Sequence, residues 1–284
     1  MNKLSILKQI GLMAAILAIL FAPLSSDLRA AERVTVKGSD TMVILGQRWA
    51  ETYMAKNPES VIQVTGGGSG VGFAALINGT TDICEASRPI KPKETQSLKA
   101  RFNVPGVEIP VARDGLTVYL NEANKVSELT MDQLAAIYSG EILNWKEVGG
   151  EDAKIIVYGR ENSSGTYVYF KDEVLKGEDF APQVQTLPGT AAIVNAIAKD
   201  KQGIGYGGAA YAKGVKYCAM KADAAAPAYK PDLEHVKSGA YPLSRYLFWY
   251  VRNKPSGEIK KFVDFVLSEE GQKVVSEVGY FPLK

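Results

Sequence analysis

The sequence has little of the chemistry on which metal sites and acid–base enzymes depend. Its 284 residues include one histidine and two cysteines. A protein zinc site usually takes four cysteine, histidine or carboxylate ligands with short paired spacings, so we expect no metal and no other cofactor. The histidine, His235, lies in the polar stretch DLEHVKSG, where we expect it to be solvated. Nothing there positions it as the base of a serine hydrolase.

Motifs of nucleotide-dependent and esterase chemistry are also missing. The sequence contains no G-x-x-x-x-G-K-[ST] loop and no G-x-S-x-G turn. The segment GIGYGG at 203–208 matches G-x-G-x-x-G, but a dinucleotide fingerprint must follow a strand and open a helix. Here Ile204 and Tyr206 indicate that the segment is itself a strand. These absences favour a binding protein over an enzyme.

Residues 1–31 predict a secretory signal peptide that is not part of the fold. Lys3 and Lys8 precede the apolar core IGLMAAILAILFA, and a polar stretch then ends at Ala30 and Ala31. The apolar core is shorter than a membrane-spanning helix, which needs about 20 residues. The alternative interpretation is an uncleaved N-terminal anchor. We therefore expect a protein that is secreted to the periplasm.

The rest of the chain carries almost no net charge. The leader contains three basic residues and one acidic residue, so it accounts for the formal net charge of +2 of the whole chain. A neutral protein has no general attraction for nucleic acid or anionic lipid, so any bound anion must be held by local contacts. Export would permit a disulfide between Cys84 and Cys218, although two separate buried thiols are the simpler interpretation.

From Val34 onward, strand periodicity alternates with helical periodicity, which is typical of an α/β fold. RVTVKG alternates like a strand, and the helical run after it places its apolar residues on one face, at Met42, Leu45, Trp49 and Tyr53. Further along the chain, the cluster YLFWY at 246–250 is interpreted as a buried strand.

Two long β-rich runs, IPVARDGLTVYLN and YPLSRYLFWYVR, bracket a central α/β set. This arrangement predicts that the chain crosses twice between two lobes. We expect residues 32–112 plus 246–284 to form lobe 1 and residues 113–245 to form lobe 2. The crevice between the lobes is then the expected ligand site.

Three junctions between a strand and a helix repeat the same residue types, namely Gly38-Ser39-Asp40-Thr41, Gly68-Ser69-Gly70 and Ser164-Gly165-Thr166. The first turn of a helix offers unpaired N–H groups and the positive end of the dipole. Glycine lets the backbone approach a ligand, and hydroxyl groups donate. Arg160, before the third junction, can hold two oxygens of a tetrahedral anion in a planar fork. Together these features predict a site for a small oxyanion, although each junction alone also fits an ordinary cap or turn.

Several segments carry a family resemblance. KGSDTMV, GGGSGVG, TDICEASR, YGRENSSGTYVYF and GIGYGG resemble the periplasmic phosphate-binding proteins of ABC importers, the PstS family, from about Val34 to Lys284. The most specific part is the R-x-x-x-S-G-T pattern after a strand. The resemblance implies a two-lobed periplasmic-binding-protein fold of type II that closes over one phosphate. It also implies a monomer without enzymatic activity that delivers phosphate to the membrane permease subunits of an ABC importer.

The resemblance further implies a ligand set. Transferred by motif, the set comprises Thr41, the N–H of Met42, Ser69, Arg160, Ser164, Gly165 and Thr166, with Ser39 and Arg88 as further candidates from the same segments. Many family members place an aspartate at the position of Arg88, where it accepts the proton of monohydrogen phosphate. We therefore assign this role to Asp40, with Glu85 as the second choice. The alternatives left open are a binding protein for sulfate, molybdate or a short organic acid, and an enzyme that acts on phosphate esters.

Overall fold

The computed structural model describes residues 32–283, which belong to one compact unit. The expected signal peptide, residues 1–31, lies outside the described residues. Within the described residues, no helix has the length and apolar character to cross a membrane.

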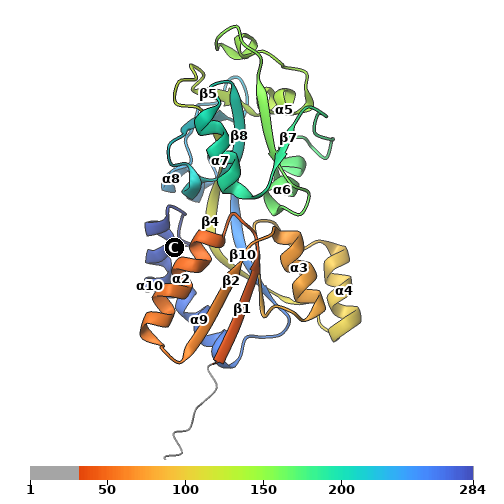
Figure 1. The fold of residues 1–284 in the computed structure, drawn as a ribbon, viewed down its shortest axis with the longest axis vertical. Helices are drawn as coiled ribbons and strands as arrows, with labels where there is room; N and C mark the ends of the chain where they lie inside the picture. Colours follow the sequence, from red (N-terminus) through yellow and green to blue (C-terminus); the bar gives the residue numbers. More distant parts are fainter. Residues whose placement is uncertain (1–31, 284) are drawn as a thin grey trace, which may run out of the picture. The chain divides into compact units, whose positions relative to one another are not determined.

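The strands of the described chain form one mixed sheet (Figure 1). Their order is β2-β1-β3-β10-β4-β8-β6-β7, and β9 pairs with both β4 and β5. The strands are β1 (Glu32–Gly38), β2 (Ser60–Thr65), β3 (Ile83–Ala86), β4 (Val107–Leu120), β5 (Glu128–Thr130), β6 (Ile156–Arg160), β7 (Gln185–Leu187), β8 (Gly203–Gly208), β9 (Lys216–Lys221) and β10 (Ser244–Val251).

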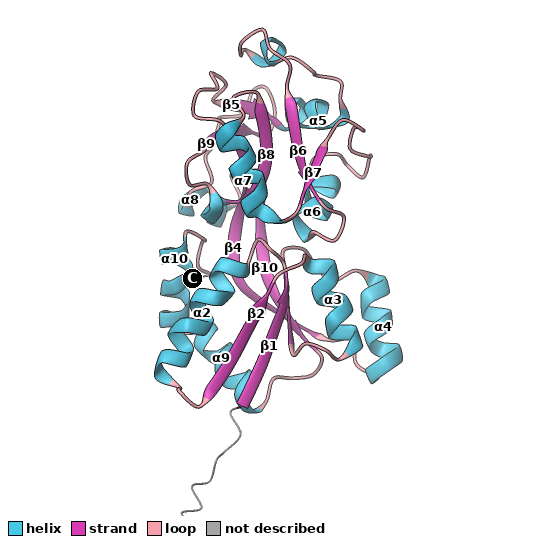
Figure 2. Ribbon diagram, viewed as in Figure 1, coloured by secondary structure: helices cyan, strands magenta, loops and turns pink. Residues whose placement is uncertain are grey.

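Helices cover both faces of the strands (Figure 2). In lobe 1, α2, α9 and α10 pack together beside β1 and β2, and α3 packs against β1, β3 and α4. The helices are α2 (Val43–Lys56), α3 (Ser69–Asn78), α4 (Pro92–Phe102), α5 (Met131–Ser139), α6 (Gly165–Glu173), α7 (Gly189–Lys199), α8 (Leu233–Ser238), α9 (Gly257–Leu267) and α10 (Glu269–Val278), with 3-10 turns η1 (Trp145–Val148) and η2 (Ala209–Tyr211).

Strands β4 and β10 run antiparallel and connect the two lobes (Figure 1). The two halves of β4 bury their side chains in different hydrophobic clusters. Val111 and Ala112 pack in the core of lobe 1, whereas Leu116 and Val118 pack in the core of lobe 2. The predicted two-lobed α/β fold with two crossing strands is therefore confirmed.

The core of lobe 1 forms where the helical periodicity of the sequence predicts it. The apolar face of α2 and the residue before it are buried, at Met42, Leu45, Trp49 and Tyr53. The Trp49 ring packs edge-on against Trp249 of β10, with centroids 5.4 Å apart. Each such buried side chain contributes about 1.5–3 kcal/mol to the stability of the lobe. This packing sets the position of the loop between β1 and α2.

In lobe 2, contacts between aromatic rings hold α6 in place. Phe170 of α6 stacks on Tyr206 of β8 with centroids 4.1 Å apart, and Tyr138 of α5 lies 4.6 Å from the same Phe170 ring. Aromatic pairs at such distances contribute about 0.5–1.5 kcal/mol of stability beyond the contribution of the surface area that they bury. The N-terminus of α6, which carries the third junction, is thus held against the end of β6.

Three further predictions can be compared with the described residues. The segment GIGYGG is β8, as predicted. The YLFWY cluster lies in β10 and is buried except for Tyr246, which is 40% exposed. Cys84 and Cys218 are both free and buried, in different hydrophobic clusters, so the disulfide is not formed.

Candidate functional site

The first two junctions and a further serine lie at one edge of the lobe 1 sheet. Strand β1 pairs in parallel with both β2 and β3, so the carboxyl ends of the three strands meet at the same edge. Ser39 follows β1, Ser69 opens α3 after β2, and Ser87 follows β3. The N–H of Ser39 donates to the carbonyl of Glu85 at 2.9 Å, which ties the first loop to the end of β3.

Five buried hydroxyl groups meet at this edge, and we call them the hydroxyl cluster. Thr41 Oγ1 lies 2.8 Å from Thr166 Oγ1, which lies 3.3 Å from Ser87 Oγ. Ser39 Oγ donates to Ser87 Oγ at 2.9 Å, and Ser69 Oγ lies 3.5 Å from that same atom. Because a hydroxyl group can donate as well as accept, the cluster can turn several donors towards one small anion.

Thr166 comes from lobe 2, and the other four hydroxyl groups come from lobe 1. Glycine makes this approach possible, because a Cβ on Gly165 would lie 2.2 Å from Ser69 Oγ and 2.8 Å from Ser87 Oγ. Nearby, the N–H of Gly70 donates to the carbonyl of Ser163 at 2.9 Å. The structure thus brings the three predicted junctions together across the two lobes.

Local hydrogen bonds hold the backbone of the junctions in place. Ser164 Oγ caps α6 by accepting from the N–H groups of Thr166 at 3.2 Å and Tyr167 at 3.3 Å. The capped turn presents the positive end of the α6 dipole to the hydroxyl cluster. The N–H of Met42 donates to the carbonyl of Ser39 at 2.9 Å, and the Met42 side chain is buried in the core of lobe 1.

Arg160 is 1% exposed and ends β6. Its guanidinium binds Glu161 through Nε at 3.1 Å and Nη2 at 2.9 Å, and it donates through Nη1 to Thr190 Oγ1 at 2.9 Å. The same Nη2 reaches across to Asp40 Oδ2 of lobe 1 at 3.0 Å. Burial alone would raise the pKa of Glu161, but the hydrogen bonds and charge of Arg160 outweigh burial and lower that pKa below its ordinary value.

Asp40 links the two lobes and caps no helix. Its Oδ2 accepts from Arg160, its Oδ1 accepts from the N–H of Gly67 at 2.8 Å, and its carbonyl accepts from the Tyr211 hydroxyl of lobe 2 at 2.7 Å. The N-cap of α2 is Met42, so Asp40 does not act as the cap of this helix. The carboxylate of Asp40 is therefore held beside the predicted anion-binding arginine.

Glu85, the second candidate for proton acceptor, faces away from the hydroxyl cluster. Its side chain is completely buried, and Oε1 accepts from Trp249 Nε1 at 3.2 Å and faces Gly46 of α2. Oε2 has no hydrogen-bond partner among the described residues. Burial raises the pKa of Glu85 to about 8, the Trp249 hydrogen bond opposes this increase, and the charge of Asp40 adds to it.

Arg88 has partners of its own. It donates two hydrogen bonds to Glu94 of α4, at 2.9 Å and 2.7 Å, and one to the carbonyl of Pro89 at 2.9 Å. Its guanidinium also lies over the Phe73 ring, 4.8 Å from the centroid. The assignment of Arg88 to the ligand set remains a prediction, and these contacts direct the side chain towards α4.

Three residues that the structure places in the candidate site were not predicted from the sequence. Ser87 lies at the centre of the hydroxyl cluster, and a strand end followed by a hydroxyl, as at Ser39, was a signal that could have identified it. Arg245 donates to Thr166 Oγ1 at 3.0 Å and pairs with Asp114 at 2.8 Å. Neither Asp114 nor Arg245 stands in a local motif, because the two residues meet only through the pairing of β4 with β10.

The charged groups around the hydroxyl cluster have no excess of positive charge. Two guanidinium groups, those of Arg160 and Arg245, are paired with the carboxylates of Asp40, Glu161 and Asp114. An anion bound here would be held by directed donors and helix dipoles instead of an excess of positive charge. Such an arrangement can recognise a desolvated anion, but it offers no obvious nucleophile–base pair.

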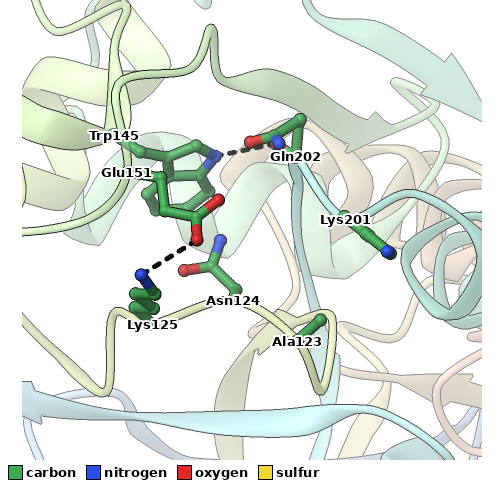
Figure 3. A pocket seen from close by; sticks show the side chains of 7 residues that line it. All are labelled: Ala123, Asn124, Lys125, Trp145, Glu151, Lys201 and Gln202. Atoms are coloured by element: carbon green, nitrogen blue, oxygen red, sulfur yellow. Dashed lines mark hydrogen bonds and ion pairs between the residues drawn. The ribbon is translucent and has the colours of Figure 1, made fainter.

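Other polar groups of the described chain lie elsewhere. Figure 3 shows a surface pocket lined by Asn124, Lys125, Trp145, Glu151 and Gln202, beside the Gly203 end of β8. Gly208, at the other end of β8, pairs with Leu116 near the hydroxyl cluster. His235 lies on α8, where its Nδ1 pairs with Asp232 at 2.7 Å. No group of three or more metal-binding side chains occurs among residues 32–283.

Comparisons with known proteins agree with the fold. The family model for the PBP superfamily domain matches residues 25–270. Phosphate-binding protein PstS of Pseudomonas aeruginosa is 36% identical over 263 residues, which cover 87% of this chain and 81% of that protein. Phosphate-binding protein PstS of Staphylococcus aureus is 36% identical over 266 residues, covering 90% of this chain and 79% of that protein.

Solved structures give the same result. A crystal structure from Clostridium perfringens, described as a phosphate ABC transporter substrate-binding protein with bound phosphate, has a TM-score of 0.81 and 30% identity and covers 89% of this chain and 100% of that one. An ABC-type phosphate transport receptor from Vibrio cholerae has a TM-score of 0.70 and 30% identity, covering 87% of this chain and 99% of that one. The chain therefore belongs to the PBP superfamily and, within it, to the PstS family of phosphate-binding proteins.

Proposed function

We propose that this protein binds one inorganic phosphate between its two lobes and delivers it to the membrane permease subunits of an ABC importer. The observation that carries the proposal is the hydroxyl cluster, in which Thr41 of lobe 1 and Thr166 of lobe 2 lie 2.8 Å apart in a buried position. Donors from helix N-termini and a guanidinium suit a small tetrahedral oxyanion. The relatives named as phosphate-binding proteins favour phosphate among such anions.

In this proposal the anion is bound by residues from both lobes. Lobe 1 comprises residues 32–112 plus 246–284, and lobe 2 comprises residues 113–245. The donors are the side chains of Ser39, Thr41, Ser69, Arg160, Ser164 and Thr166 and the N–H groups of Met42 and Gly165. Because these donors belong to two lobes, closure of the lobes over the anion completes the site.

Asp40 is the proposed acceptor of the phosphate proton. Its carboxylate lies 3.0 Å from Arg160 Nη2, so it stands beside a donor that would contact the anion. A carboxylate accepts a hydrogen bond from a phosphate O–H, whereas it meets only lone pairs on sulfate, and in a closed site that contact is repulsive. Phosphate would thereby be selected over sulfate.

The same arrangement favours binding and delivery over catalysis. Hydrolysis of a phosphate ester needs an activated nucleophile, a base or a metal. The only histidine of the chain is paired with Asp232 on α8, and the hydroxyl cluster is surrounded by arginines whose carboxylate partners already bind them. We propose that the mature protein is an exported monomer whose partners are phosphate and the permease.

Isothermal titration calorimetry of the mature protein with phosphate, sulfate and molybdate tests this function. We expect one phosphate per chain, much weaker binding of the other two anions, and little dependence on salt because the contacts are buried. A parallel assay for phosphate-ester hydrolysis should give no turnover. Sulfate binding as tight as phosphate binding, or measurable hydrolysis, would contradict the proposal.

A further inference from the structure

Arg245 holds an unusual position at the crossing between the lobes. It lies on β10 directly opposite Asp114 of β4, and the two side chains are 3% and 0% exposed. Its Nε and Nη2 donate to Asp114 Oδ2 at 3.0 Å and 2.8 Å, while Asp114 Oδ1 accepts from the N–H of Ala209 at 3.1 Å. The guanidinium plane is thus fixed by a two-point contact and by its stacking over Tyr169, 5.0 Å from the ring centroid.

The rest of the guanidinium reaches both lobes. Nη1 donates to the carbonyl of Ser87 at 3.1 Å, and Nη2 donates to Thr166 Oγ1 at 3.0 Å. Thr166 Oγ1 is the atom of the hydroxyl cluster that also contacts Thr41 Oγ1. Arg245 is therefore one hydrogen bond away from the point where the two lobes meet.

The two arginines of the site differ in how far their charge is neutralised. Arg160 is bound to two carboxylates, those of Glu161 and Asp40. Arg245 is bound to one carboxylate, that of Asp114, and its other two contacts are uncharged oxygens. A guanidinium has five N–H groups, and the four hydrogen bonds of Arg245 leave one for a ligand.

We propose that Arg245 is a second anion-binding guanidinium of this site and that Asp114 is its positioning residue, an inference that rests on the proposed binding of phosphate at the hydroxyl cluster. The ligand it favours is a dianionic oxyanion, because a less neutralised guanidinium stabilises two negative charges more than one. Since Arg245 lies on a crossing strand and contacts both lobes, its hydrogen bond to the anion also stabilises the closed arrangement.

The test compares phosphate affinity at two pH values. At mildly acidic pH phosphate is mainly the monoanion, and at mildly alkaline pH it is mainly the dianion. The titratable groups that face Arg245 are Asp114 and Tyr119 on β4, Tyr169 on α6, and Tyr280. Burial raises the pKa of Tyr169 to about 12 and raises the pKa values of Tyr119 and Tyr280 well above their ordinary value, so the tyrosines stay neutral at both pH values.

We expect Arg245→Gln to lower phosphate affinity about tenfold or more at alkaline pH, and by a clearly smaller factor at acidic pH. Arg245→Lys should keep most of the preference for the dianion, because the charge remains, while losing the two-point contact with Asp114. Asp114→Asn should reduce affinity less than Arg245→Gln, because it weakens the contact that orients the guanidinium but keeps the charge of Arg245. Arg252→Gln, just beyond β10, is the matched control and should bind as the unchanged protein does, because its partners are Asp82 and the carbonyl of Thr81.

Thermal unfolding without phosphate shows whether each variant is folded. If Arg245→Gln does not fold, Arg245→Lys still tests the inference. An equal loss of affinity at both pH values would make Arg245 a purely structural residue and overturn the inference. Unchanged binding by Arg245→Gln, together with loss of binding by Arg160→Ala, would overturn it while leaving the proposed function intact. Failure of the unchanged protein to bind phosphate would overturn the proposed function itself.

Discussion

The buried carboxyl group of Glu85 should make the stability of this protein depend on pH in an uncommon direction. Glu85 is completely buried against Trp249 and Gly46, and its Oε2 has no partner among the described residues. Burial raises its pKa from the ordinary 4.5 to about 8. Between these values the unfolded chain has released the proton and the folded chain still holds it. The folded state therefore binds more protons, and the free energy of unfolding falls as the pH rises.

The size of the effect follows from the two pKa values. The slope is at most about 1.36 kcal/mol per pH unit, and over the whole window the loss is on the order of 5 kcal/mol. This is a large part of the about 5–15 kcal/mol that stabilises a typical folded protein. Replacing Glu85 with glutamine removes the titration but keeps the shape and the acceptor for Trp249. An extra amide N–H left without a partner should cost about 1–3 kcal/mol at acidic pH.

Urea unfolding of the unchanged protein and of Glu85→Gln, at several pH values from about 5 to about 9, measures this difference. Subtracting the two curves cancels the titration of groups that both proteins share. We expect the Glu85→Gln protein to be the less stable one at the acidic end and the more stable one at the alkaline end, so that the curves cross. Parallel curves across this range would refute the reasoning, because they would mean that Glu85 ionises in the folded state as it does in the unfolded chain.

Three further predictions concern the proposed phosphate site. Arg160→Ala should lower phosphate affinity by about 1.5–3 kcal/mol, roughly tenfold to a hundredfold, with Arg160→Lys in between, as measured by calorimetry; an unchanged affinity would place the anion elsewhere. Gly165→Ala should weaken binding by about 1–3 kcal/mol in calorimetry because its Cβ would lie 2.2 Å from Ser69 Oγ; equal affinity would show that Ser69 rotates away. Asp40→Asn should shift selectivity towards sulfate by roughly tenfold in competition binding; if Glu85→Gln does so instead, Glu85 is the proton acceptor.

Much of the fold could be predicted because it depends on local patterns. The alternation of RVTVKG and the apolar spacing at Met42, Leu45, Trp49 and Tyr53 identify β1 and α2 without any knowledge of their neighbours. The three strand-to-helix junctions could be identified for the same reason, since caps and glycine-rich turns are properties of short segments. The two long strands β4 and β10 were visible as β-rich runs, which was enough to predict two crossings between the lobes.

The partners of individual side chains were harder to predict, even where a local clue existed. Arg88 stands where the family resemblance implies an aspartate, and its guanidinium binds Glu94, six residues later, at the first turn of α4. For Asp40, an ordinary cap was the alternative to the predicted role of proton acceptor, but α2 begins after Met42 and Asp40 instead pairs with Arg160 of lobe 2. In both cases the position in sequence was clear and the direction of the side chain was not.

The sequence by itself determined the elements, their order and the glycine- and hydroxyl-rich junctions between strand and helix, because these depend on periodicity, capping and glycine within a few residues. Only the tertiary structure decided which of these residues meet. The register of β4 with β10 places Arg245 opposite Asp114, 131 positions away, and the approach of the lobes sets Thr41 beside Thr166. Such contacts depend on how distant segments pack, and no local pattern encodes that packing, because the same short motif has the same propensities whatever lies opposite it.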